Sequence, residues 1–130
     1  MLIKNIKNIK NIKNIKNTKR KFLKPMMKHL NQTNFAENIA EGFCVVTIGA
    51  TWCSGCQILR PILEEIAPKF SEKIKFFGIN FDDAGDLLTT LNVRQIPTMI
   101  FYKNGTEIGN RLTQPKSQTN IENILNELLK

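Results

Sequence analysis

The chain has 130 residues, enough for one domain built around one hydrophobic core. It carries 19 basic and 11 acidic residues, a formal net charge of +8. Ten of the basic residues and none of the acidic ones lie in the first 28 positions. The basic excess therefore belongs to the N-terminal segment, and it gives no reason to expect that the remaining chain binds nucleic acid.

Residues 1–25 form a low-complexity basic tail in which isoleucine recurs at every third position from Ile3 to Ile15. This period suits neither one face of a helix nor one face of a strand, so we expect the tail to be disordered. We expect neither a secretory signal nor a membrane span, because the apolar runs are too short. Four interpretations of the tail stay open: an organellar transit peptide, an anion-binding segment, an inert tail, or an untranslated extension ahead of Met26 or Met27.

After the tail, the pattern alternates between helices and strands. A short helix is expected to begin here with Thr33 or Asn34 as its N-cap, and Glu37 lies three residues after Asn34, as a capping box requires. The apolar patterns that follow predict, in chain order, a buried strand over 43–50, a helix over 57–70 kinked at Pro61, a strand over 74–81 and a short helix over 82–93.

Two alternating runs then surround Asn104-Gly105, a dipeptide typical of hairpin turns because both turn positions need positive φ. Residues 98–112 are therefore predicted to form a β-hairpin, and 113–130 a C-terminal amphipathic helix. A parallel β-α-β crossover followed by a hairpin predicts an α/β fold. Its mixed central β-sheet would be flanked by helices on both faces.

Cys53 and Cys56 stand three residues apart in the stretch "TWCSGCQ". Such a pair is found in structural zinc sites and in redox sites. A structural zinc needs four ligands, and the other candidates are Cys44, expected inside a buried strand, and His29, beside the tail. We therefore expect no metal here and favour the redox interpretation.

In the redox interpretation, Cys53 falls where a strand ends and a helix begins, so helix-terminal N–H groups and the helix dipole stabilise its thiolate. Cys56, one turn further, is expected to face the interior. An accessible Cys53 would attack a substrate disulfide, and a sheltered Cys56 would then attack Cys53 to release the product. Ser54-Gly55 keeps the turn short enough for an internal disulfide.

The sequence resembles the thioredoxin family over residues 26–130, with "WCSGC" where that family usually has Trp-Cys-Gly-Pro-Cys. Pro61 matches the kink proline of the active-site helix, Ile96-Pro97-Thr98 matches the family's cis-proline segment, and Asn104-Gly105 matches its hairpin turn. The resemblance implies a thioredoxin fold and a protein-disulfide reductase that needs no cofactor of its own. Its partners would be disulfide-containing client proteins and an NADPH-dependent flavoprotein, thioredoxin reductase.

The same resemblance implies a surface for client chains. Trp52 would flank the disulfide as a flat apolar contact, and a cis Pro97 would lie against the sulfurs. The backbone at Ile96, with Thr98 beside it, would then pair with an extended client segment.

Several positions near the cysteines depart from the family pattern. Thr47 stands where the family commonly buries an aspartate that serves the resolving thiol, and Gly78 stands where a lysine is usual on the next strand. Gly55, beside Ser54, replaces the proline between the cysteines. Since the expected base for Cys56 is lost, we expect these residues to tune a competent but slower and less pH-dependent exchanger.

Two alternatives remain open: an oxidase- or isomerase-like relative, and a binding module that kept the fold without the chemistry. The expected lack of a secretory signal and the unpaired Cys44 count against an oxidising compartment. We therefore expect a cytoplasmic monomer with a role in electron transport and redox homeostasis, and give less weight to organellar import through the basic tail.

Overall fold

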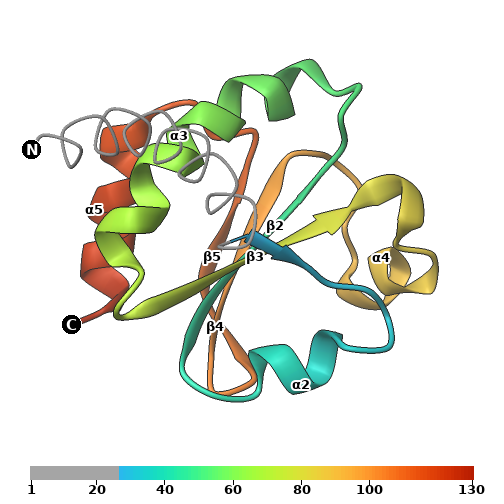
Figure 1. Cartoon of the computed structure of the whole chain (residues 1–130), viewed down its shortest axis with the longest axis horizontal. Helices are drawn as coiled ribbons and strands as arrows, with labels where there is room; N and C mark the ends of the chain where they lie inside the picture. The colour runs from blue at the N-terminus through green and yellow to red at the C-terminus, as the bar shows by residue number, and fades with distance from the viewer. Residues whose placement is uncertain (1–26) are drawn as a thin grey trace, which may run out of the picture.

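The computed structural model describes residues 27–130, so the predictions for the tail and for Met26 lie outside the described residues. Its centre is a five-stranded sheet in the order β1-β3-β2-β4-β5 (Figure 1). The pairs β1/β3 and β3/β2 are parallel, whereas β2/β4 and β4/β5 are antiparallel. The strands are β1 Met27–His29, β2 Phe43–Gly49, β3 Ile74–Asn80, β4 Thr98–Lys103 and β5 Thr106–Thr113.

Helices cover both faces of this sheet (Figure 1). They are α2 Phe35–Ile39, α3 Ser54–Phe70, α4 Asp86–Leu91 and α5 Gln118–Leu128, and a 3-10 turn spans Phe81–Asp83. Helices α3 and α5 lie on one face, and α2 and α4 lie on the other. The predicted mixed α/β sheet flanked by helices on both faces is confirmed.

Strand β2 separates two apolar clusters because its side chains alternate between the faces. Val45 packs with Leu59 of α3, whereas Val46 packs with Leu87 of α4. Thr47 follows the parity of Val45, so its side chain points towards α3. This parity places Thr47 beneath the helix that carries Cys56.

The predicted hairpin is confirmed, with positive φ at Asn104 (51°) and Gly105 (86°) between β4 and β5. The amide of Asn104 donates to the carbonyl of Gly42, and its side-chain oxygen accepts from the amide of Gly42. The predicted helices around Pro61 and near the C-terminus are also present. Helix α3 runs unbroken through both Pro61 and Pro68.

Three predictions of detail were wrong or incomplete. The strand β1 was not foreseen. The capping box at Asn34 does not form, because the Asn34 side chain accepts the amide of Asn31 instead of a helix amide. The helix expected over 82–93 divides into the 3-10 turn and α4, with Gly85 between them at a φ of 56°. Within residues 27–130, none of the helices has the length and apolarity to span a bilayer.

Candidate active site

The two spaced cysteines lie at the start of α3, just after β2 ends. Cys53 is the N-cap of this helix, and its Sγ accepts the amide N–H of Cys56 at 3.2 Å. The prediction that Cys53 marks the strand-to-helix junction is confirmed. A backbone N–H aimed at this sulfur stabilises negative charge there, and the thiolate is the form that attacks a disulfide.

The exposure of the two thiols differs from the sequence-based expectation. All three cysteines are free thiols, and Cys53, expected to be accessible, is only 8% exposed. Cys56, expected to be sheltered, is half-buried. Cys53 is the less exposed of the two because its sulfur packs against the first turn of α3, whereas Cys56 borders a cavity.

The surroundings of Cys56 favour its neutral thiol. Burial raises its pKa from an ordinary 9.0 to about 11, and a hydrogen bond with the Cys53 side chain adds to the rise. A hydrogen bond from the backbone at Ala50 and the charge of Arg60 act in the opposite direction and lower the pKa. At neutral pH, Cys56 must therefore lose a proton before it can act as a nucleophile.

The segment Ile96-Pro97-Thr98 lies beside the cysteines, and its Ile96–Pro97 peptide bond is cis, as predicted. A Cβ built on Gly55 would lie 3.1 Å from Cδ of Pro97, so the proline packs directly against the turn between the cysteines. Thr98 is 5% exposed and its hydroxyl donates to the carbonyl of Gln95, so its side chain shapes this loop from inside.

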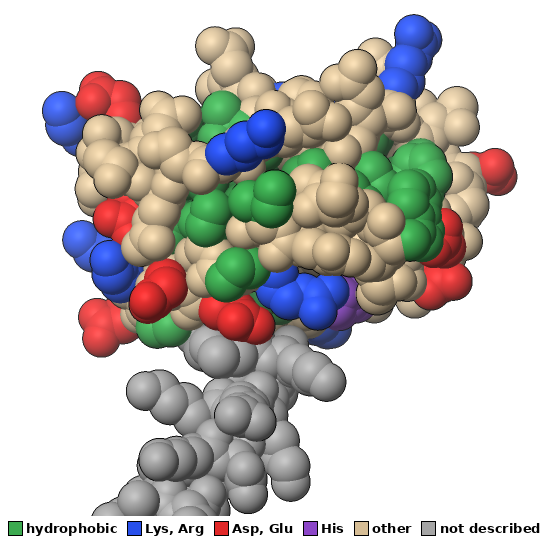
Figure 2. Space-filling view, turned by 90° about the horizontal axis from the view of Figure 1, so that it is seen from above, with side chains coloured by type: hydrophobic (Ala, Val, Ile, Leu, Met, Phe, Trp, Pro, Cys, Tyr) green, Lys and Arg blue, Asp and Glu red, His purple; other side chains and the backbone are tan. Residues whose placement is uncertain are grey.

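Trp52 is the most exposed large apolar side chain of residues 27–130, with 61% of its surface accessible. Its Nε1 donates to a carboxylate oxygen of Asp82 at 2.8 Å, and its ring meets Phe81 edge-on at 6.1 Å between centroids. Figure 2 looks down on the end of the molecule where α3 begins, and apolar side chains gather across the middle of this face. Trp52 is thus both exposed and held in place, which suits a contact surface.

Thr47, Gly78 and His29 form a row across three strands, because Gly78 pairs with Thr47 on one side and with His29 on the other. Among the described residues, Oγ1 of Thr47 is buried and has no hydrogen-bond partner. A Cβ on Gly78 would lie 3.3 Å from Nε2 of His29, so the imidazole occupies room that a side chain at Gly78 would need. In the sequence, His29 lies next to the basic tail, and no motif marks it as part of this site.

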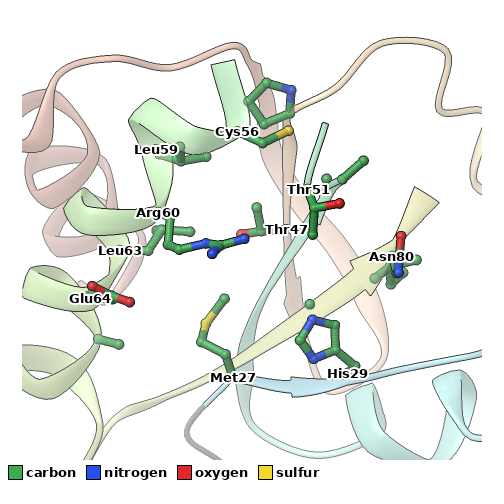
Figure 3. Close-up of a pocket in the computed structure, with 16 residues that line it drawn as sticks. Met27, His29, Thr47, Thr51, Cys56, Leu59, Arg60, Leu63, Glu64 and Asn80 are labelled. Atoms are coloured by element: carbon green, nitrogen blue, oxygen red, sulfur yellow. The ribbon is translucent and has the colours of Figure 1, made fainter. Parts of the chain in front are cut away.

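Beneath Cys56, this row borders a cavity of about 540 Å³ (Figure 3). Helix α3 supplies one wall and the strand row supplies the other, and Pro97 lies at the active-site end. The guanidinium group of Arg60 extends across the cavity in front of Thr47, and the ring of His29 faces it from the opposite wall (Figure 3). The small side chains at positions 47 and 78 leave this space open.

The chain is similar to known proteins over most of its described residues. The family model described as Thioredoxin matches residues 26–127. Thioredoxin of Haemophilus influenzae is 30% identical over 102 residues, covering 76% of this chain and 94% of that protein, and thioredoxin of Chlamydia pneumoniae is 33% identical over 102 residues, covering 78% and 98%. The chloroplastic M-type thioredoxin of spinach is 33% identical over 81 residues, covering 61% of this chain and 45% of that protein.

A solved structure supports the fold independently. It comes from work on the thiol resolving mechanism of a yeast mitochondrial 1-Cys peroxiredoxin via glutathione/thioredoxin systems, and it matches with a TM-score of 0.70 at 23% identity, covering 78% of this chain and 94% of that one. A dithiol at a helix start beside a cis-proline defines a thiol–disulfide oxidoreductase of the α/β class. The chain belongs to the thioredoxin family, and its activity is the reduction of protein disulfides.

Proposed function

We propose that this protein carries electrons from an NADPH-dependent flavoprotein, thioredoxin reductase, to the disulfides of client proteins, with Cys53 as nucleophile and Cys56 as resolving thiol. One observation carries this assignment of roles. The sulfur of Cys53 receives the amide N–H of Cys56 at the helix start, while burial keeps Cys56 protonated.

The reaction has two exchange steps. The thiolate of Cys53 attacks a client sulfur, forming a mixed disulfide and releasing the other client sulfur as a thiolate. Cys56 then loses its proton and attacks Sγ of Cys53, so the Cys53–Cys56 disulfide forms and the bond from Cys53 to the client breaks. The client gains two electrons, which the reductase later restores to the cysteine pair.

The surface around the cysteines supports a client that binds as an extended chain. Trp52 offers an exposed apolar face, and Ile96 is half-buried next to Pro97. The carbonyl of Ile96 accepts from the Gln114 side chain at 3.4 Å, a long contact that a client amide can replace.

The direction of electron flow is tested by titrating the Cys53/Cys56 couple against defined dithiothreitol or glutathione ratios. A midpoint near about −270 mV, with NADPH oxidation coupled through thioredoxin reductase, is expected for a reductase. A midpoint of about −200 mV or higher would favour the oxidase- or isomerase-like alternative. The absence of a reversible couple would favour a binding module.

We further propose that the protein works as a monomer in the reducing cytoplasm. The free and fully buried Cys44 supports this setting, since an oxidising compartment selects for paired cysteines. Fractionation of the native host, with sedimentation of the purified protein, tests both proposals. Recovery in an organelle fraction, or sedimentation as a dimer, would contradict them.

A further inference from the structure

The resolving step needs a proton acceptor, and the cavity beneath Cys56 contains groups suited to that purpose. Cys56, Thr47, Arg60 and His29 all line one space of about 540 Å³. That volume is ample for several water molecules. The hydroxyl of this lining Thr47 is buried and has no protein partner, and a water molecule is the usual partner of such a group.

We propose that water in this cavity takes the proton of Cys56 during the resolving step, with Thr47 Oγ1 anchoring the water and His29 receiving the proton at the cavity mouth. The inference rests on the proposed roles of Cys53 and Cys56. It replaces the expectation, drawn from Thr47 and Gly78 alone, that the resolving step lacks a dedicated acceptor.

The sheet register places the two ends of this route. Thr47, Gly78 and His29 share one row, and their parity directs them to the face under α3. Because Gly78 has no side chain, His29 can lie over it and face the cavity. His29 is also exposed, so a proton that it accepts can pass to bulk solvent.

Arg60 places a positive charge near Cys56. Its charge acts on Cys56 and lowers the pKa of that thiol, partly offsetting the rise caused by burial. Among the described residues, the titratable or charged side chains that face Cys56 or line its cavity are Cys53, Arg60 and Glu64 on α3 and His29 on β1. The lining residues of β2, β3 and the Pro97 segment add none, so His29 and Glu64 are the two candidate acceptors.

The step balances in protons and electrons. The proton of Cys56 passes through water to the imidazole, which becomes an imidazolium. The Cys56 thiolate attacks Sγ of Cys53, and the client sulfur leaves as a thiolate that takes a proton from solvent. Thr47 and His29 act through water and do not touch the reacting sulfurs, so they are positioning residues.

The experiment isolates the resolving step. A mixed disulfide between Cys53 and the coloured thiol thionitrobenzoate is formed at acid pH, the pH is then raised in a stopped-flow instrument, and release of the coloured thiolate is followed. Thr47→Val, which removes the hydroxyl but keeps the shape, should slow release by about tenfold to a hundredfold, at or below the low end of proton-transfer effects. Thr47→Ser, which keeps the hydroxyl, should restore it.

The pH profile tests His29 against Glu64. In the unmodified protein, the rate of release should reach a plateau as the pH is raised, because the imidazole accepts the proton. His29→Gln should remove this plateau, so that release rises about tenfold per pH unit with thiol ionisation alone. Glu64→Gln, on the same cavity wall, should leave the profile unchanged.

Two results would overturn the proposal: release from Thr47→Val at the unmodified rate, or a plateau that survives in His29→Gln. Failure of the proposed function looks different. In that case the unmodified protein would form no mixed disulfide, or would form one and never release the coloured thiolate at any pH.

Discussion

The two faces of the sheet differ in how completely they are packed, and a cysteine on each side shows the consequence. Cys44, facing α2 and α4, is 0% exposed among large apolar side chains, and its sulfur contacts the carbonyls of Asn38 and Glu41 at 3.9 and 3.8 Å. Cys56, on the α3 side, borders the open cavity. Burial raises the pKa of both thiols. Cys56 is therefore expected to react, and Cys44 to be inert, because of the difference in packing and not because of a difference in acidity.

The largest expected effect is the loss of all exchange on removing Cys53. Cys53→Ser should abolish both mixed-disulfide formation and reduction of a protein disulfide, because the serine hydroxyl is not ionised at neutral pH. Turnover with thioredoxin reductase and NADPH measures it. The matched Cys44→Ser variant should keep full turnover, and a loss there would contradict the division between the two faces.

A second prediction compares the reactivity of Cys44 and Cys56 directly. In Cys53→Ser, alkylation of Cys56 by iodoacetamide should rise about tenfold per pH unit at neutral pH and level off only well above its ordinary pKa. Cys44 should remain unlabelled until the protein unfolds. Peptide mass mapping after timed alkylation separates the two, and early labelling of Cys44 would contradict the packing difference.

The raised pKa of Cys56 also predicts a change in stability with pH. The unfolded thiol ionises near 9.0, whereas the folded one ionises at about 11. The stabilisation is therefore fully present below pH 9 and is lost as pH rises through 11, because the unfolded state releases its proton first. Denaturant midpoints measured for the reduced protein and for Cys56→Ala should diverge in this range, with the loss smaller in the variant.

Two neighbouring positions on β2, one on each face of the sheet, are expected to differ in their effect on the free energy of unfolding. Ile48 is 0% exposed on the packed face, and Ile48→Ala should lower the free energy of unfolding by about 2–5 kcal/mol. Thr47→Val on the cavity face should change it by no more than about 1 kcal/mol, since a hydroxyl without a protein partner is removed and the shape is kept. Urea denaturation of both variants gives the two values. A loss of about 2 kcal/mol or more in Thr47→Val would show that its hydroxyl makes a stabilising contact.

A smaller effect on rate than the loss of Cys53 is expected from a change at Gly49, where β2 ends. A Cβ at this position would lie 3.0 Å from Sγ of Cys56, so Gly49→Ala must displace that sulfur by a few tenths of an ångström. The resolving step should slow by roughly tenfold while the attack by Cys53 keeps its rate, because only one of the two sulfurs is misplaced. Stopped-flow measurement of both steps would show it, and equal slowing of both would place the strain elsewhere.

Much of this architecture follows from sequence patterns that act locally. The β-branched run of β2, the alternating runs around Asn104-Gly105 and the apolar face of α5 each predict their own element. The spacing of Cys53 and Cys56 predicts the dithiol at a helix start, and the resemblance identifies Pro97 beside it. Each of these features can be predicted because the residues that produce it lie close together in the sequence.

The cavity and its far wall could not be read in this way. Strand β1 has three residues, one half-buried and two exposed, and it borders a repetitive segment, so no alternation marks it. Its place is fixed by pairing with β3, a contact between residues about fifty positions apart. The cavity exists because Thr47 has a small side chain and Gly78 has none. A sequence pattern of apolar residues does not reveal such a cavity.

The position of Trp52 has a practical consequence. It is the single tryptophan of the chain, so intrinsic emission at long wavelength reports on one place in the molecule. The indole adjoins Cys53 in sequence, and its ring is fixed by Asp82 and Phe81. Oxidation, reduction or capture of a client at the neighbouring sulfur changes the surroundings of this fluorophore, and catalysis can be followed in real time without attaching a dye.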